Sequence, residues 1–247
     1  MIDLHCHLLP GIDDGPSSIH DAVRMARVAV EDGTTTVVCT PHRRPRFPNT
    51  PAIVRDAVAA FRERLAEEDI ALELVTGMEI DIGELVAMAP EERAEATLGD
   101  GPWLLVEMPF EGWPLDLARL MTELELQGLR VVLAHPERNS SVQKNPDRVR
   151  DLVGRGALVQ VNAESITGEF GIQAQHAAER LLRSGYVHVI ASDAHTPTRR
   201  PPGLRAAQTR AAEVLGALPG DIAWMVDGIP RAIITGDVVR PPRLPGS

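Results

Sequence analysis

The chain begins with a short segment whose histidines could bind a metal ion. Residues 2–7 read Ile-Asp-Leu-His-Cys-His, and this mostly apolar segment predicts a buried β-strand. Successive side chains of a strand alternate between its two faces, so Asp3, His5 and His7 share one face. The other face then carries Ile2, Leu4 and Cys6. Because neutral imidazole is a common ligand of zinc, iron and manganese, His5 and His7 could bind one divalent cation together.

Further histidines and carboxylates follow other apolar segments, at the point where each segment ends. With the first pair they form nine candidate ligands: His5, His7, Asp14, His42, Glu79, Glu107, His135, Asp193 and His195. If the apolar segments are parallel strands of a barrel, their carboxyl ends meet at one end of it, where such barrels carry their active sites. One cation needs only about four to six ligands. The set therefore predicts two or three metal ions, an arrangement suited to the hydrolysis of phosphate esters.

Arginines follow several of these ligands and could bind a phosphate group. Guanidinium pairs with phosphate through two parallel hydrogen bonds. Arg138 follows His135 and Arg200 follows His195 at close spacing, so we expect both arginines to contact the phosphate. For the other arginines we expect exposed loop positions, with recognition of a substrate protein as the alternative. These are Arg43, Arg44, Arg46 and Arg199.

The remaining polar candidates have ordinary structural explanations. We expect structural roles for three histidines, which are His20, His176 and His188. Glu137 and Asn139 flank Arg138 and could support it. Asp13, beside Asp14, stays open between stabilising a turn and serving the site.

The two cysteines, Cys6 and Cys39, are too few for a disulfide framework, and we expect both to be small buried residues. A phosphatase that uses a Cys-x5-Arg loop would need arginine at positions 12 and 45. Ile12 and Pro45 stand there instead. This spacing excludes a thiol nucleophile of that kind.

Composition limits the classes of protein that fit. The chain has 247 residues, 44% hydrophobic and 24% charged, which is typical of a folded protein with a sizeable core. Its net charge of −10 argues against a nucleic-acid partner, although metal ligands account for part of the acidic excess. Neither a signal-peptide pattern nor an apolar run of membrane-spanning length is evident. We expect a cytoplasmic protein without membrane insertion.

Short apolar segments alternate with amphipathic helical patterns, which predicts a parallel sheet built of βα units. The expected strands are 2–7, 35–40, 72–79, 103–107, 130–135, 158–162 and 187–191. The expected helices are 18–32, 52–68, 82–96 (helical or irregular, broken at Pro90), 115–127, 147–155, 173–184, 204–215 and 221–235. Without a linker between them, these elements predict a single α/β domain over residues 1–238, a closed or nearly closed (β/α)7 barrel. Residues 239–247 are expected to form a disordered tail.

Four motifs make the sequence resemble the polymerase-and-histidinol-phosphatase (PHP) superfamily, and within it the CpsB/YwqE/CapC-type bacterial protein-tyrosine phosphatases. The motifs are His5-Cys-His7-Leu-Leu-Pro-Gly-Ile-Asp13-Asp14-Gly-Pro, Thr40-Pro-His42, Ala134-His135-Pro-Glu-Arg138, and Ser192-Asp193-Ala-His195 followed by Arg200-Pro-Pro. The resemblance runs from residue 1 to about residue 235. It implies a distorted, TIM-barrel-like (β/α)7 barrel, the PHP fold, that holds three divalent metal ions. Manganese is the expected metal, with iron and zinc as alternatives.

The resemblance also implies which residues bind each metal. One ion would be held by His5, His7, Glu79 and Asp193. A second would share Glu79 and use Glu107 and His135, and a third would use Asp14, His42 and His195. The functionally important arginines would be Arg138 and Arg200.

The implied reaction is direct hydrolysis of phosphotyrosine, in which a metal-bridging hydroxide attacks phosphorus, with His42 as one candidate proton donor. The implied substrate is the phosphorylated tail of a bacterial tyrosine kinase of capsule or exopolysaccharide synthesis. A homo-oligomer is one option for the assembly. Three alternatives remain: a small-molecule phosphatase of the histidinol-phosphate type, a DNA-end nuclease, and a non-catalytic metal-bound scaffold. Turnover of histidinol phosphate would favour the first and cleavage of single-stranded DNA the second. Absence of phosphatase activity with all metals bound would favour the third.

Overall fold

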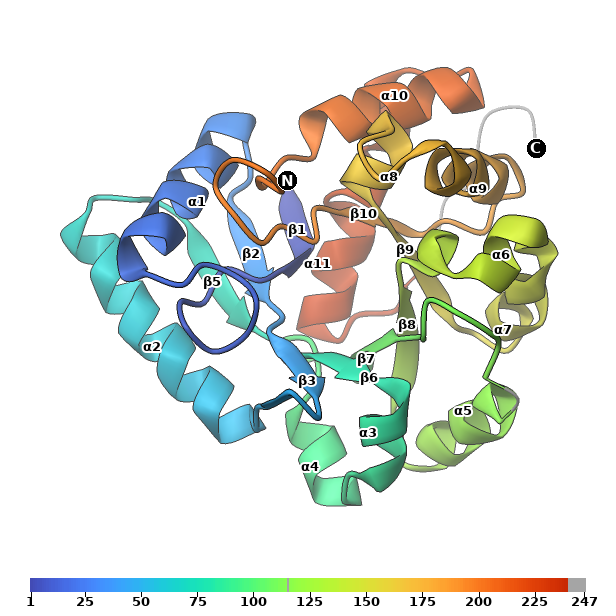
Figure 1. Ribbon diagram of the computed structural model, residues 1–247, viewed down its shortest axis with the longest axis horizontal. Coiled ribbons are helices and arrows are strands. Elements are labelled where there is room, and N and C mark those ends of the chain that lie inside the picture. Colours follow the sequence, from blue (N-terminus) through green and yellow to red (C-terminus); the bar gives the residue numbers. More distant parts are fainter. Residues whose placement is uncertain (115, 240–247) are drawn as a thin grey trace.

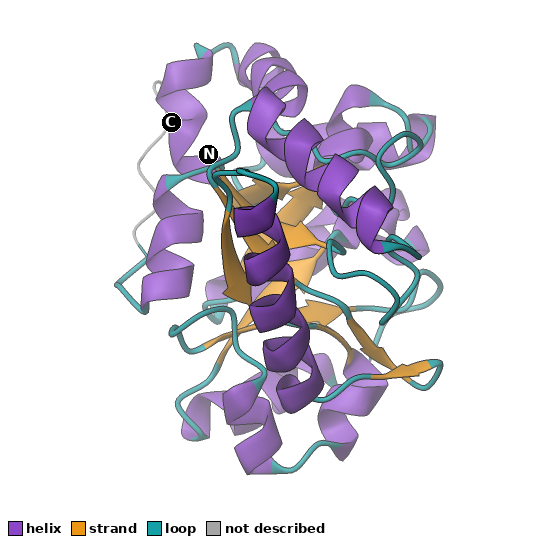
Figure 2. Ribbon diagram, turned by 90° about the vertical axis from the view of Figure 1, so that its left-hand side faces the viewer, coloured by secondary structure: helices purple, strands orange, loops and turns teal. Residues whose placement is uncertain are grey.

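The computed structural model describes residues 1–114 and 116–239, with the strands in the middle and the helices around them (Figure 1). The strands are β1 (Ile2–Cys6), β2 (Thr36–Cys39), β3 (His42–Arg44), β4 (Phe47–Pro48), β5 (Glu73–Thr76), β6 (Glu79–Asp81), β7 (Trp103–Glu107), β8 (Arg130–Ala134), β9 (Leu158–Asn162) and β10 (Val189–Ala191). All of their pairings are parallel except that of β3 with β4, a short hairpin that projects from the right of the strands in Figure 2.

The strands close into a ring. β1 pairs with β2, and β2 pairs with β5. The chain continues from β2 into β3 and from β5 into β6, and β3 pairs with β6. From β6 the pairing continues through β7, β8 and β9 to β10. The ring closes where Cys6 bridges Ala194, with hydrogen bonds from Asp193 N–H to His5 O (2.8 Å) and from His7 N–H to Ala194 O (2.9 Å). If β2 with β3 and β5 with β6 are each taken as one broken strand, the ring has seven. The predicted distorted (β/α)7 barrel is confirmed.

Helices cover the outside of this ring. The α-helices are α1 (Ile19–Asp32), α2 (Pro51–Glu67), α3 (Ile82–Ala87), α4 (Pro90–Glu95), α5 (Leu117–Leu126), α6 (Ser140–Lys144), α7 (Arg150–Gly154), α8 (Ala163–Thr167), α9 (Ile172–Arg183), α10 (Arg205–Leu215) and α11 (Gly228–Thr235). Three 3-10 helices join them: η1 (Pro136–Arg138), η2 (Pro146–Val149) and η3 (Pro219–Met225). Within the described residues, no helix combines the length and the apolar character needed to cross a membrane.

Two apolar clusters hold the barrel together. The larger one lies between the strands and the helices, and a smaller one fills the barrel, where Leu4, Leu105 and Ala191 pack together. Ile229 and Ile233 of α11 belong to the inner cluster, so this helix closes the amino end of the barrel. Fully burying such a Leu or Ile side chain stabilises the fold by about 1.5–3 kcal/mol. Apolar side chains therefore fill the part of the barrel near its amino end, and the candidate metal ligands lie at its carboxyl end.

The predicted alternation along the first strand is wrong in part. Leu4 belongs to the inner cluster, whereas Cys6 belongs to the outer one, so the two do not share a face. The register of β1 against β2 shifts by one residue between Asp3 and Cys6. Such an extra residue, a bulge, reverses the facing of the side chains that follow it. Bulges leave no clear signal in a short apolar segment.

Other differences concern the interruptions of elements. The predicted strand 72–79 is divided into β5 and β6 around Gly77, where a Cβ atom would lie 2.8 Å from Val38 Cγ1 and from Leu98 Cδ2. The predicted helix 221–235 is divided into η3 and α11, and 147–155 into η2 and α7. The β3–β4 hairpin and the short helices α6 and α8 are unpredicted. Of the predicted tail, residues 240–247 lie outside the described residues, as does residue 115 of the predicted helix 115–127.

Candidate metal centre

The structure brings all nine candidate ligands together at the carboxyl end of the barrel. Their ligand atoms form three groups, each within 4.8 Å: His5, His7, Glu79 and Asp193; His7, Asp14, His42 and His195; and His42, Glu79 and Glu107. The ninth residue, His135, joins the third group, because its Nε2 lies 2.8 Å from Glu79 Oε1 and 3.9 Å from Glu107 Oε1. The first group matches the ligand set implied for one metal, and the other two overlap with the remaining sets.

Glu79 is the centre of the cluster. Its Oε2 lies 2.8 Å from His42 Nδ1, 3.2 Å from His7 Nε2 and 3.4 Å from His5 Nε2. Yet this buried oxygen has no hydrogen-bond partner of acceptable geometry. An unsatisfied buried carboxylate oxygen is costly in a folded protein.

The donor set fits divalent cations. The Nε2 atoms of His5 and His7 lie only 3.2 Å apart, and both lie within 3.4 Å of Asp193 Oδ1. Nitrogen lone pairs and carboxylate oxygens that converge on one point, in a place closed to solvent, are the ligands of zinc, iron or manganese. A cation at that point would also satisfy Glu79 Oε2.

Neighbouring residues fix the orientation of the two histidines of β1. Asp13 Oδ2 lies 2.7 Å from His7 Nδ1, and Gln160 Oε1 lies 3.0 Å from His5 Nδ1. Each contact turns the Nε2 atom of its histidine into the cluster, as carboxylates and amides do behind the histidines of metal sites. Gly15 allows the Asp13 turn to pack here, since a Cβ atom would lie 2.5 Å from His7 O. Asp13 therefore contacts a candidate ligand, which favours the site role over the turn role that the sequence left open beside it.

Two ligands are held in a left-handed backbone conformation. His135 has φ of 30° and Asp193 has φ of 51°, both unusual for residues other than glycine. Such conformations cost on the order of 1–3 kcal/mol and persist where the surroundings impose them, often at functional sites. Buried Glu137 helps to impose the first, because it accepts hydrogen bonds from Asn162 N–H (3.0 Å) and Ser165 Oγ (2.7 Å) and thereby anchors η1.

The charges of the cluster shift the acidities of its members. For His42, burial would lower the pKa, but Glu79 and Asp14 outweigh it and raise the pKa to about 9. Burial would raise the pKa of Glu79, yet the surrounding histidines hold it well below its usual range. Glu107 has a raised pKa, because it is buried beside the charge of Glu79. The cluster thus carries strong negative charge that histidine protons, or a cation, must balance.

Three arginines border the cluster. Arg138 Nη1 and Arg200 Nη2 lie 3.2 and 2.7 Å from Asp193 Oδ2. Arg44 Nη2 lies 2.6 Å from Asp14 Oδ2 and lines the pocket, so the expectation of an exposed loop charge is wrong for this residue. It is also wrong for Arg43, which is half-buried and pairs with Glu84 and Glu92. Arg46 and Arg199 are exposed, as expected.

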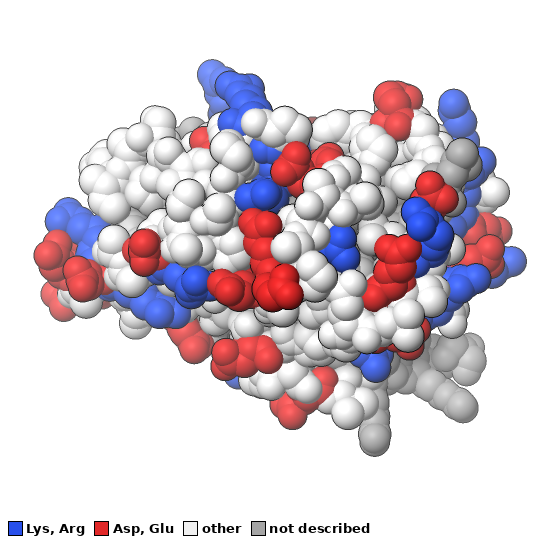
Figure 3. Space-filling view, turned by 90° about the horizontal axis from the view of Figure 1, so that it is seen from below, with Lys and Arg blue, Asp and Glu red and all other residues white. Residues whose placement is uncertain are grey.

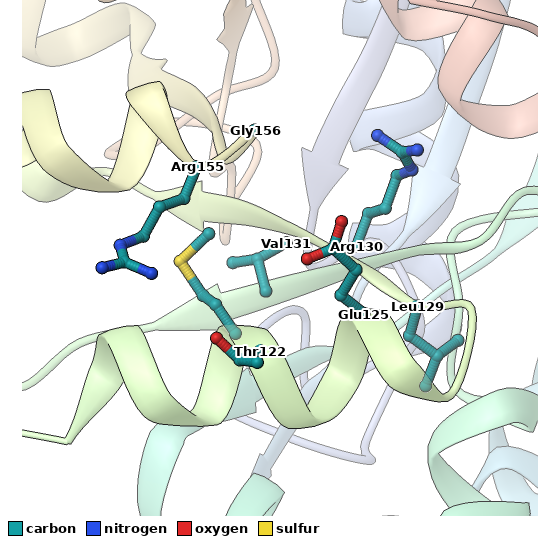
Figure 4. A pocket seen from close by; sticks show the side chains of 8 residues that line it. Thr122, Glu125, Leu129, Arg130, Val131, Arg155 and Gly156 are labelled. Atoms are coloured by element: carbon teal, nitrogen blue, oxygen red, sulfur yellow. The ribbon is translucent and has the colours of Figure 1, made fainter.

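The cluster opens to the surface through a pocket of about 170 Å³ lined by seven of the nine candidate ligands, the three bordering arginines and Phe110. Another hollow, of about 130 Å³, lies between α5 and the amino ends of β8 and β9 (Figure 4). Its lining holds a single carboxylate, Glu125, beside Arg130 and Arg155. The donors for a multivalent cation therefore belong to the first pocket.

The cysteines are buried and unpaired, as predicted. Burial raises the pKa of Cys39 to about 12 and that of Cys6 well above its usual value. Thiols that stay protonated and closed to solvent are poor nucleophiles, which agrees with the exclusion of thiol catalysis.

Comparison with known proteins identifies the family. The model of the family described as "Capsular polysaccharide synthesis, CpsB/CapC" matches residues 1–217. The chain belongs to the CpsB/CapC family. Tyrosine-protein phosphatase YwqE of Bacillus subtilis (strain 168) is 39% identical over 201 residues, 81% of this chain and 79% of that protein. The putative tyrosine-protein phosphatase CapC of Staphylococcus aureus is 32% identical, with the same shares covered.

Solved structures agree with this CpsB/CapC assignment. One is from the crystal structures of YwqE from Bacillus subtilis and CpsB from Streptococcus pneumoniae, described as unique metal-dependent tyrosine phosphatases. It matches with a TM-score of 0.88 at 32% identity and covers 97% of this chain and 96% of that one. The lactonase Lmo2620 of Listeria monocytogenes matches with a TM-score of 0.59 at 11% identity, with 94% of each chain covered. That second likeness shows the fold alone.

Proposed function

We propose that this protein is a metal-dependent protein-tyrosine phosphatase that hydrolyses phosphotyrosine without a phosphoenzyme intermediate. It would use three divalent cations, with manganese as the expected metal. The observation that carries the proposal is the convergence of nine candidate ligand side chains, eight of them buried, beside Arg138 and Arg200, in a member of the CpsB/CapC family. We further propose a phosphorylated bacterial tyrosine kinase of capsule or exopolysaccharide synthesis as the substrate, since the matching relatives are named tyrosine-protein phosphatases.

Two of the three proposed ligand sets share Glu79. His5, His7, Glu79 and Asp193 would hold one ion; Glu79, Glu107 and His135 a second; and Asp14, His42 and His195 a third. When bound, such ions supply Lewis acidity toward the phosphoryl oxygens and a water that loses its proton near neutral pH.

The arginines would bind the phosphate and neutralise charge as the bond to the leaving oxygen breaks. Asp193 Oδ2 receives Arg138, Arg200 and the Asn162 amide (2.6 Å), so Asp193 Oδ1 is turned toward the histidines. Both guanidinium groups are only half-buried, which leaves further N–H groups to donate to phosphoryl oxygens. Planar guanidinium is well shaped for this contact.

His42 is one candidate donor of the proton that the leaving oxygen receives. Both of its ring nitrogens face carboxylates: Nδ1 lies 2.8 Å from Glu79 Oε2 and Nε2 lies 3.3 Å from Asp14 Oδ1. This favours the ligand role of His42 over proton donation. A tyrosine phenolate, with a pKa of about 10, needs less help to leave than a serine alkoxide. The site is therefore better suited to aryl esters.

A nuclease finds less support. The chain carries a net charge of −10, and on the face seen in Figure 3 basic side chains are interspersed with acidic ones. Binding to nucleic acid draws on clustered Lys and Arg.

The test is turnover by the manganese-reconstituted protein of a phosphotyrosine peptide, a phosphoserine peptide, histidinol phosphate and single-stranded DNA. We expect selective hydrolysis of the phosphotyrosine peptide, which is lost in His135→Ala and kept in His188→Asn, a change at a buried histidine outside the cluster. Hydrolysis of histidinol phosphate or DNA alone would replace the proposal by one of the alternatives. Inactivity on all four substrates with metals bound would favour a scaffold.

A further inference from the structure

Phenylalanine is concentrated around the mouth of the site. The chain has four phenylalanines, and only Phe61 lies in the core between strands and helices. The ring of Phe110, which follows β7, lies 6.2 Å from that of His135, and the ring of Phe47 on β4 stacks at 6.2 Å on that of His42. Phe170 precedes α9 and lies beside Arg138 and Arg200. In a chain with 3% aromatic residues, this placement calls for a physical reason.

An arginine lies over the face of each of these three rings. The guanidinium of Arg138 lies 4.7 Å from the ring centre of Phe110 and 4.5 Å from that of Phe170, while Arg200 lies 5.2 Å from Phe170. Contacts of this length are attractive cation–π interactions. Phe170 therefore limits the positions that both phosphate-binding arginines can adopt.

Phe110 differs from the other two rings in its exposure. It is 45% exposed and lines the pocket together with Glu107 and His135, whereas Phe47 and Phe170 are half-buried. An apolar ring at the rim of a polar pocket gains free energy when another apolar group covers it. Phosphotyrosine presents a phenyl ring directly behind its phosphate, where phosphoserine presents only a short methylene.

We propose that Phe110 packs against the phenyl ring of the substrate and so selects aryl over alkyl phosphates, and that Phe170 is a positioning residue for Arg138 and Arg200. This inference rests on the proposed phosphatase function and names the feature of the substrate that the site recognises. It predicts different kinetic signatures for the two rings. Loss of Phe110 affects aryl esters alone, while loss of Phe170 affects all phosphate esters.

The experiment compares kcat/KM for phenyl phosphate and glycerol 3-phosphate in the manganese-loaded wild type, Phe110→Ala, Phe110→Trp and Phe170→Ala. For Phe110→Ala we expect about a fivefold loss on phenyl phosphate, mostly in KM, because the lost contact is the same in ground and transition states. Glycerol 3-phosphate should be unaffected, and Phe110→Trp should restore the preference. Phe170→Ala should lower kcat/KM for both esters equally. Leu126→Ala, an exposed apolar residue on α5, is the control.

A binding measurement gives a readout that does not need turnover. The dissociation constant of phenylphosphonate, measured by calorimetry with the manganese-loaded protein, should rise about fivefold in Phe110→Ala, while that of methylphosphonate stays unchanged. Equal losses on both esters, or no change on either, would overturn the role of Phe110, because it would then act only through Arg138 or not at all. A wild type that hydrolyses glycerol 3-phosphate but not phenyl phosphate would instead overturn the proposed function.

Discussion

Two buried histidines at opposite ends of the barrel show how differently one residue type can be used. His135 follows β8 at the carboxyl end, where its Nε2 lies 2.8 Å from a Glu79 oxygen. His188 precedes β10 at the amino end, where its Nδ1 accepts the N–H of Val159 at 3.1 Å. Burial alone lowers the pKa of a histidine. It lowers that of His188 to about 4, whereas Glu79 and the other carboxylates outweigh burial and raise that of His135.

The partner of a buried histidine, and not its burial, identifies a metal site. At the amino end a neutral imidazole satisfies one backbone amide, which is a structural task. At the carboxyl end histidines and carboxylates converge, and although Glu79 Oε1 is hydrogen-bonded to His135, Glu79 Oε2 is left unsatisfied. Only the second arrangement has negative charge for a cation to balance.

The largest effect should come from removing the shared charge of the carboxyl-end cluster. Glu79→Gln keeps the size of the side chain but removes the charge that two of the three proposed metals share. We expect kcat/KM for a phosphotyrosine peptide to fall by at least about a thousandfold. Glu91→Gln, on the exposed surface of α4, is the matched control and should retain full activity. Near-normal turnover by Glu79→Gln would remove Glu79 from the centre of the site.

A weaker effect, on metal affinity, is expected from a residue that orients a ligand without binding the metal itself. Asp13→Asn replaces the carboxylate beside His7 Nδ1 by an amide, which should lower the affinity for the metals by about 10–100-fold. Titration of the metal-free protein with Mn²⁺, followed by calorimetry, measures this affinity, and the exposed Asp56→Asn is the control. Unchanged affinity would mean that Asp13 merely stabilises its turn.

The smallest effect should appear at the amino end, and only as stability. With a folded pKa of about 4 and an ordinary value of 6.5, folded His188 binds fewer protons than the unfolded chain between these pH values. Its contribution to the free energy of unfolding is therefore complete above pH 6.5. This contribution declines as the pH falls toward 4, by up to about 3 kcal/mol.

His188→Asn can still accept the Val159 N–H but does not titrate. Urea unfolding at pH 7.5 and pH 4.5 should thus show a smaller loss of stability in this variant than in the wild type, with the difference as the readout. Turnover at pH 7.5 should be unchanged. An equal loss in both proteins would show that His188 is not the titrating group.

The convergence of the candidate ligands at the carboxyl end could be predicted from sequence, because strand ends meet in a barrel whatever the local detail. The positions of His135 and Asp193 could be predicted from the ends of the apolar segments that precede them. The bulge in β1 could not be predicted, since Leu4 and Cys6 are both apolar and suit either face. The role of Asp13 depends on a distance to His7 that no spacing rule supplies.

The β3–β4 hairpin was missed for a related reason. Arg43-Arg44-Pro45-Arg46 has the composition of an exposed loop, yet β3 pairs with β6 and Arg44 reaches Asp14. That pairing depends on contacts distant in sequence. The helices α6 and α8, of five residues each, are too short to produce a helical period.

The most direct test of the account is anomalous X-ray diffraction from crystals grown with Mn²⁺, measured at the manganese edge. The account predicts peaks among the nine ligands of the carboxyl end, with one between His5, His7, Glu79 and Asp193, and none beside His188. A map with no peak in that cluster, from protein that hydrolyses phosphotyrosine, would contradict it.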